Sequence, residues 1–297
     1  MVEETSGMEY PNRSSVDGRG ALITGCSPGI GRETAVKLAE HGFTVFATVR
    51  KEADAENLRN LKILNLVPVC PVDLTNLDPI TNAAKMVADE LNRRGKKGLY
   101  ALINNAGGGS PAPVELMALD PFHRELQTRI LGSVAMVQAF LPLIRQASGR
   151  ILWIMTPALI PISYVTSIHA CDFALNCVAR TLDIELKPWR IPNIMIRCGG
   201  IKTPAGLRTT ADVGAIFQKE PHERVALYQK ALQKWAKDMA KFDERRTEPE
   251  KVAQVVLKAL STKRPKRRYS IGYMAKAASF LEALPQSLAD GNLKLRF

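Results

Sequence analysis

The chain has 297 residues, of which 46% are hydrophobic and 24% charged. This is the composition of an ordinary soluble globular protein, and it excludes disordered and collagen-like chains. The five cysteines are odd in number and widely spaced, and no signal-peptide pattern opens the chain, so we expect a reducing, cytoplasmic environment without disulfides. The four histidines are scattered and lack zinc-ligand spacing, so we expect no metal site.

The formal net charge of +12 is large, and basic residues concentrate in "TKRPKRRYS" at 262–270. Such a field attracts phosphates, nucleic acids and anionic membrane surfaces. The simplest interpretation is a solvated basic face, and the alternative is peripheral contact with an intracellular membrane through 262–270. No nucleic-acid-binding motif accompanies the charge, so we expect no nucleic-acid partner.

Secondary-structure patterns alternate along most of the chain. Residues 1–18 are polar and lack a hydrophobic period, which predicts a flexible tail. Short apolar runs separated by helical patterns then follow, at 21–24, 44–49, 67–72, 99–104, 150–155 and 192–198. This alternation predicts an α/β fold in one domain, a Rossmann-like doubly wound parallel sheet of at least six strands with helices on both faces.

The pattern changes after residue 204. Residues 205–245 are charged and mostly helical, which predicts an insertion that covers the ligand cleft as a substrate lid. A helix follows, with Thr247 as its expected N-cap and Glu250 three residues on. Residues 268–272 predict a last edge strand. We therefore expect the main domain at 19–275 and a C-terminal extension at 276–297.

The first strand-to-helix turn reads "ITGCSPGIG", with Gly25, Gly29 and Gly31 in the spacing GxxxGxG. Glycines at such a turn let the backbone approach a pyrophosphate, whose charge is met by the amide hydrogens that open the next helix. Ser27 and Ile30 lie in the same turn, and we expect them to contact the same ligand.

Four motifs in order resemble the short-chain dehydrogenase/reductase family over about residues 20–275. They are "TGxxxGIG", "VDL" at 72–74, "NNAG" within 103–109 and "CGGIKTP", which is similar to the family's "PGxIxT". The resemblance implies a nicotinamide cofactor. It places Asp73 near the adenine amino group and Thr203 near the nicotinamide amide. Further implied contacts, on the adenosine side, are Asn104, Asn105, Ala106 and Gly107.

The end of the second strand bears on which cofactor binds. A carboxylate near Val49 would suit the ribose of NAD, but Arg50 and Lys51 follow instead. Cations there suit a 2′-phosphate, so we expect NADP(H) rather than NAD(H). The alternative is that Arg50 is only a surface cation.

The catalytic positions depart from the family pattern. The family uses a Ser, a Tyr, a Lys four residues after the Tyr, and an Asn in the preceding helix. "GRILWIMTP" resembles "GRIVNISS" and places Thr156 on the Ser, while "LGSVAMVQAFLP" places Arg129 on the Asn. "DFALN" resembles "KFALE", so Asp172 takes the Lys position and Ile168 the Tyr position.

A second register remains open. Counting from Thr156 by the family's usual spacing reaches His169 for the Tyr and Phe173 for the Lys. His169 titrates near neutrality and can substitute as an acid, although a histidine at a helix start also commonly packs or caps. Tyr164 is interpreted as loop packing, with proton donation as its alternative.

The replacements at positions 129 and 172 introduce opposite charges. We predict that Arg129 and Asp172 form a direct or water-bridged ion pair, which avoids two isolated buried charges. The alternative is that Arg129 extends outward while Asp172 meets the ribose hydroxyls.

Three functional hypotheses follow. The first is an atypical enzyme that uses Thr156, His169, Asp172 and Arg129 in a redox-neutral isomerisation, cyclisation or dehydration. The second is a catalytically silent cofactor-binding scaffold or sensor, and the third is an NADPH-dependent oxidoreductase with His169 as proton donor. The apolar stretch "WIMTPALIPI" favours a small hydrophobic substrate. The resemblance also implies a homodimer or homotetramer.

Overall fold

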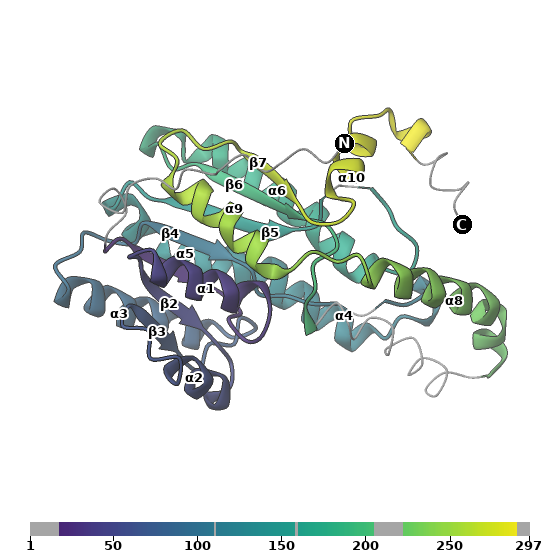
Figure 1. Cartoon of the computed structure of the whole chain (residues 1–297), viewed down its shortest axis with the longest axis horizontal. Helices are drawn as coiled ribbons and strands as arrows, with labels where there is room; N and C mark the ends of the chain where they lie inside the picture. Colours follow the sequence, from purple (N-terminus) through teal and green to yellow (C-terminus); the bar gives the residue numbers. More distant parts are fainter. Residues whose placement is uncertain (1–17, 110, 158–159, 205–221, 290–297) are drawn as a thin grey trace.

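The computed structural model describes residues 18–109, 111–157, 160–204 and 222–289. Seven parallel strands form one sheet in the order β3-β2-β1-β4-β5-β6-β7 (Figure 1). The strands are β1 (Gly20–Ile23), β2 (Thr44–Thr48), β3 (Leu66–Val69), β4 (Ala101–Asn104), β5 (Arg150–Met155), β6 (Asn193–Cys198) and β7 (Arg268–Ile271). The predicted doubly wound sheet is confirmed.

Helices cover both faces of this sheet, as crossover connections between parallel strands require (Figure 1). The α-helices are α1 (Ile30–Glu40), α2 (Glu52–Arg59), α3 (Leu77–Arg93), α4 (Leu119–Leu126), α5 (Gly132–Gln146), α6 (Thr166–Glu185), α8 (His222–Asp243), α9 (Pro249–Ser261) and α10 (Ala275–Glu282). Short helical turns are η2 (Val114–Leu116), the π-helical η3 (Gln127–Leu131) and η4 (Lys187–Trp189).

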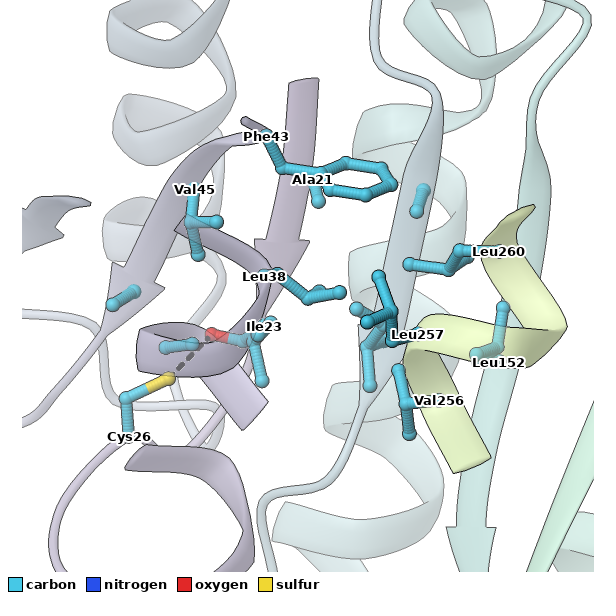
Figure 2. Close-up of a cluster of buried hydrophobic side chains, with 14 of the residues drawn as sticks. Ala21, Ile23, Cys26, Leu38, Phe43, Val45, Leu152, Val256, Leu257 and Leu260 are labelled. Carbon is cyan, nitrogen blue, oxygen red and sulfur yellow. Dashed lines mark hydrogen bonds between the residues drawn. The ribbon is translucent and has the colours of Figure 1, made fainter. Parts of the chain in front are cut away.

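One face of the sheet packs against α1 and α9. Figure 2 shows Leu38 of α1 and Leu257 of α9 meeting strand residues such as Ile23 and Leu152. Alternate strand residues point to the opposite face, where Leu22 and other side chains pack against α3, α5 and α6. Because both faces are buried, the strands in the middle of the sheet are mostly apolar, which is why they read as hydrophobic runs.

The order of the strands reverses between β1 and β4, since β2 and β3 lie on one side of β1 and β4 to β7 on the other. Loops that follow β1 and β4 therefore leave the sheet in opposite directions and open a crevice at its carboxyl edge, where such sheets bind ligands. The glycine-rich turn after β1 and the "NNAG" segment after β4 lie at this crevice.

The later elements partly match expectation. The predicted edge strand is confirmed as β7, which pairs with β6. The N-cap prediction was wrong: Glu248 takes the N-cap position, and Pro249 fills the first helical position, which needs no amide hydrogen. Thr247 is used instead by the backbone, because its amide donates to the Gly200 carbonyl and its carbonyl accepts from Lys202.

The predicted lid is described only in its second part, which forms α8, and its residues 205–221 lie outside the described part of the chain. The predicted tail is also outside it, except for Gly18. Among the described residues, one helical stretch, Leu119–Gln146, is long and apolar enough to cross a membrane by length and composition alone. Its α5 part supplies core side chains such as Met136 and Phe140.

Candidate functional site

A crevice of about 1250 Å³ opens at the carboxyl edge of the sheet. It brings together most of the cofactor and catalytic residues expected from sequence. Those that line it are Gly25, Ser27, Gly29, Ile30, Gly31, Arg50, Asn105, Ala106, Gly107 and Thr203, together with Arg129, Thr156, His169 and Asp172. Asp73 and Asn104 are the exceptions, although Val72, Leu74 and Asn105 beside them line the crevice.

The glycine-rich turn has no room for a side chain at Gly25 or Gly31. Gly25 has a φ of +71°, and a Cβ on Gly31 would lie 2.2 Å from the Gly25 carbonyl oxygen. Asn105, which follows β4, holds this turn, since its Nδ2 donates to the carbonyls of Thr24 at 2.9 Å and Gly25 at 3.1 Å. The turn therefore leaves bare backbone facing the crevice at the start of α1, as a pyrophosphate site requires.

Asn104 and Asp73 do not line the crevice. Asn104 is buried in β4, and neither of its amide atoms has a hydrogen-bond partner among the described residues. The Asp73 carboxylate accepts from the amide of Thr75 at 2.9 Å and from its hydroxyl at 2.8 Å. The hydrogen bond from the Thr75 amide is the main reason that the pKa of Asp73 is lowered, and the charge of nearby Arg50 lowers it further.

Arg129 and Asp172 form a direct ion pair between Arg129 Nη2 and Asp172 Oδ1, as predicted. The side chain of Asp172 has no solvent exposure, and that of Arg129 has 11%. Glu125 joins the pair, with its Oε1 lying 3.5 Å from Arg129 Nε and accepting a hydrogen bond from the Gly108 amide at 2.8 Å. The site thus holds one guanidinium between two carboxylates.

The second oxygen of Asp172 fixes Thr156. Asp172 Oδ2 accepts from the backbone amide of Thr156 at 2.8 Å, at the end of β5. The hydroxyl of Thr156 is buried at the crevice and has no hydrogen-bond partner among the described residues. A buried hydroxyl without a partner costs free energy, so this group is available to a ligand oxygen.

Burial and neighbouring charges shift the pKa values of Arg129 and Glu125 in opposite directions. Burial is the largest influence on Arg129 and lowers its pKa, but the carboxylates of Asp172 and Glu125 together outweigh burial and raise the pKa. Burial also raises the pKa of Glu125, and the opposing effects of Arg129 and the Gly108 amide do not cancel that rise. The guanidinium therefore stays charged, while Glu125 takes up a proton more readily than an exposed glutamate does.

Comparison with known proteins identifies the family. Residues 19–213 match the family model described as short chain dehydrogenase. The chain belongs to this family. It is 29% identical over 258 residues to 3-amino-tetrahydro-pyrrolizinone reductase of Xenorhabdus hominickii, covering 86% of this chain and 87% of the relative. It is also 29% identical over 282 residues to human retinol dehydrogenase 5, covering 92% and 86%.

Among solved structures, a short chain dehydrogenase from Burkholderia cenocepacia in complex with NADP is similar, with a TM-score of 0.71 and 22% identity. That match covers 93% of this chain and 98% of the other. At this identity the likeness supports the fold.

Both candidates for the short chain dehydrogenase's tyrosine position line the crevice. A Cβ on Gly109 would lie 2.4 Å from Ile168 Cγ1, so Ile168 packs directly on the loop after β4. His169 Nδ1 lies 2.9 Å from the Ile160 carbonyl oxygen, and because a carbonyl only accepts, Nδ1 carries the hydrogen. Burial lowers the pKa of His169, which favours the neutral ring. The remaining nitrogen, Nε2, is then an acceptor rather than the acid expected from sequence.

A tyrosine and a lysine side chain line the crevice as well, but they come from elements other than α6. Tyr273 follows β7, and its hydroxyl accepts from Arg245 at 3.2 Å. Lys241 is an exposed residue of α8. Tyr164 packs edge-on against Trp235 with ring centroids 6.0 Å apart, which confirms its interpretation as loop packing.

Helix α8 supplies much of the apolar wall, through Trp235, Met239 and Phe242. It is fastened to the loop after β4 by the Tyr228 hydroxyl, which donates to Glu115 at 2.8 Å. From the opposite side, α10 contributes Leu281. The described part of the predicted lid therefore lines the crevice.

Two features of the site were not expected from sequence. Glu125 lies four residues before Arg129, a spacing that places two side chains on one helix face and was the available signal. The π-helical turn η3 contains Arg129 and has no recognisable sequence signature. Single π turns inside longer helices often occur at functional sites.

Proposed function

We propose that this short chain dehydrogenase binds NADP(H) and catalyses a redox-neutral step on a small hydrophobic substrate, in the class of isomerisation, cyclisation or dehydration. The observation that carries the proposal is the Arg129–Asp172 ion pair beside the unpartnered hydroxyl of Thr156. These charges occupy positions where the family has its proton-relay Asn and its Lys.

The cofactor part of the proposal is supported by the glycine-rich turn, which has no room for a Cβ at Gly31. Arg50 lines the same crevice and suits a 2′-phosphate. The similar Burkholderia protein is described in complex with NADP. Gly25, Gly31, Arg50 and Thr203 would hold the cofactor, which when bound supplies a hydride donor or acceptor at its nicotinamide ring.

The chemistry proposed for the substrate uses two groups of the chain. The Thr156 hydroxyl donates a hydrogen bond to a substrate carbonyl, and His169 Nε2 takes a proton from the neighbouring carbon. The C–H electrons move into the enolate, whose oxygen Thr156 stabilises. His169 then returns the proton to another carbon, which completes an isomerisation. Asp172 positions Thr156 through its backbone amide.

The hydrophobic substrate class is supported by the walls of the crevice, to which Trp235, Met239, Phe242 and Leu281 contribute. A pocket with apolar walls and few polar groups orients its ligand through those groups. Thr156, His169 and the Arg129–Asp172 pair are the polar groups of the crevice to which we assign this role.

Deuterium exchange tests the proposal. The protein is incubated with NADPH and a panel of hydrophobic cyclic ketones and enones in D₂O, and both deuterium in the recovered ketone and NADPH absorbance are followed. We expect deuterium incorporation without NADPH consumption, and its loss in Thr156→Val. Stoichiometric NADPH oxidation with alcohol formation would refute a redox-neutral reaction and favour carbonyl reduction, as the names of the reductase and dehydrogenase relatives suggest. Tight NADPH binding with neither signal would favour a scaffold.

A further inference from the structure

A second cavity, of about 750 Å³, lies at the opposite edge of the sheet from the crevice. Its walls come from the segments that lead into β1, β4 and β5 and from the end of α9. Since all strands are parallel, this edge holds their amino ends, while the crevice holds their carboxyl ends. The two cavities are therefore separate sites.

Five cationic side chains line this cavity, and its lining contains no Asp or Glu. They are Arg19, Lys96, Lys97, Arg150 and Lys263, and together they define what we call the basic pocket. Within the described part of the chain, none of the five forms an ion pair. The positive charge of the pocket is thus uncompensated among these residues.

Arg150 makes the basic pocket more than a set of surface lysines. It begins β5 and is 8% exposed. Its Nε is buried and has no hydrogen-bond partner among the described residues, and the same holds for the hydroxyl of Ser261 in the same wall. Burial lowers the pKa of Arg150, and the neighbouring charge of Arg19 lowers it further. A buried guanidinium without a carboxylate is unfavourable unless an anion meets it.

Helix ends explain part of this arrangement. Arg150 Nη1 donates to the carbonyl oxygens of Ala259 at 2.6 Å and Thr262 at 3.1 Å, at the end of α9, where a cation favourably meets the helix dipole. Both Arg19 and Arg150 also lie over the Tyr100 ring, at 4.3 and 5.0 Å from its centroid. These contacts leave unexplained the unpartnered Nε, the Ser261 hydroxyl and the surrounding lysines.

We propose that the basic pocket binds a phosphate-bearing anion. A guanidinium offers forked donors that match phosphate oxygens, and lysines add point charges at the rim. The volume is in the range of small-molecule sites and accommodates a diphosphate-sized group. The basic segment 262–270 begins in this wall, so either a free phosphate compound or a phospholipid headgroup can reach the pocket. The proposal is independent of the reaction in the crevice.

Calorimetric titration with inorganic pyrophosphate tests the site. The full chain is first saturated with NADPH, so that the glycine-rich turn is occupied. We expect saturable binding of one pyrophosphate per chain at low salt, weakened at least about fivefold in Lys96→Gln/Lys263→Gln. The matched control Lys85→Gln/Lys251→Gln removes the same charge from exposed lysines outside the pocket and should change the affinity less than about twofold.

A second arm identifies the source of the phosphate. Flotation with vesicles of phosphatidylcholine alone is compared with vesicles that contain phosphatidic acid. Binding only to the acidic vesicles, lost in Lys96→Gln/Lys263→Gln and kept in the control, would assign a lipid headgroup. Pyrophosphate binding without flotation would assign a soluble phosphate compound. Absence of both signals, or equal weakening in both double variants, would overturn the proposal.

Discussion

Replacing Arg129 by methionine should destabilise the protein more than replacing its partner Asp172 by asparagine. Arg129→Met leaves two carboxylates, Asp172 and Glu125, in a buried site without their shared cation. Asp172→Asn leaves Arg129 with Glu125 at 3.5 Å, and an asparagine oxygen can still accept from the Thr156 amide. Removing the cation of this ion pair should therefore cost more stability than neutralising its carboxylate.

The magnitudes follow from burial. Asp172 has no solvent exposure, so Arg129→Met should cost about 3–5 kcal/mol, the usual range for breaking a buried pair. Asp172→Asn removes a charged hydrogen bond while keeping a neutral one, and should cost about 1–3 kcal/mol. In Arg129→Met/Asp172→Asn the two losses should not add, with a coupling of about 0.5–3 kcal/mol.

Urea unfolding of the cofactor-free protein measures these differences, with the free energy of unfolding extrapolated to water for each variant. Arg59→Met is the matched control, since it removes an arginine from an exposed pair with Glu52. We expect this control to unfold like the unmodified protein. If Arg129→Met proves no more destabilising than Arg59→Met, or less destabilising than Asp172→Asn, the buried three-charge network is refuted.

Three further outcomes are expected. Thr156→Val should leave stability unchanged, because the hydroxyl has no partner to lose, yet lower the proposed exchange rate by about 10²–10³-fold; equal rates would remove its role as donor. Since burial lowers the pKa of His169, exchange should persist as pH falls through about 6.5 and decline only below it, whereas a rate that rises on acidification would indicate an imidazolium acid. Arg50→Ser should weaken NADPH binding about 10- to 100-fold and leave NADH binding nearly unchanged, as measured by cofactor fluorescence, and equal weakening of both would exclude a 2′-phosphate contact.

Most of the fold follows from local sequence rules. Strand β1, for example, is buried throughout and reads as a continuous apolar run, and the glycine-rich turn must lie between β1 and α1. The pairing of Arg129 with Asp172 could also be predicted, because opposite charges replaced residues that the family brings close together. Both predictions required only the order of the strands and helices and the positions of these residues on them.

The remaining features depend on backbone geometry that sequence does not encode locally. A π turn differs from an α turn by one residue in hydrogen-bond spacing, and nothing in "QTRIL" announces it. The tautomer of His169 is set by the carbonyl of Ile160, nine residues earlier in an irregular loop. Thr247 has the residue type of an N-cap, but its backbone pairs with Gly200 and Lys202, so the helix starts beyond it.

If Asp172 takes the family's Lys position, the charge network makes each single reversion to the family pattern unfavourable. A lysine at position 172 would place an ammonium against Arg129, which the network holds charged, and would remove the acceptor of the Thr156 amide. A tyrosine at position 168 would meet Gly109, against which Ile168 already packs closely. Asparagine at position 129 would leave Glu125 and Asp172 without a cation. In this alignment we therefore expect substitutions at positions 129, 168 and 172 to be tolerated together better than singly.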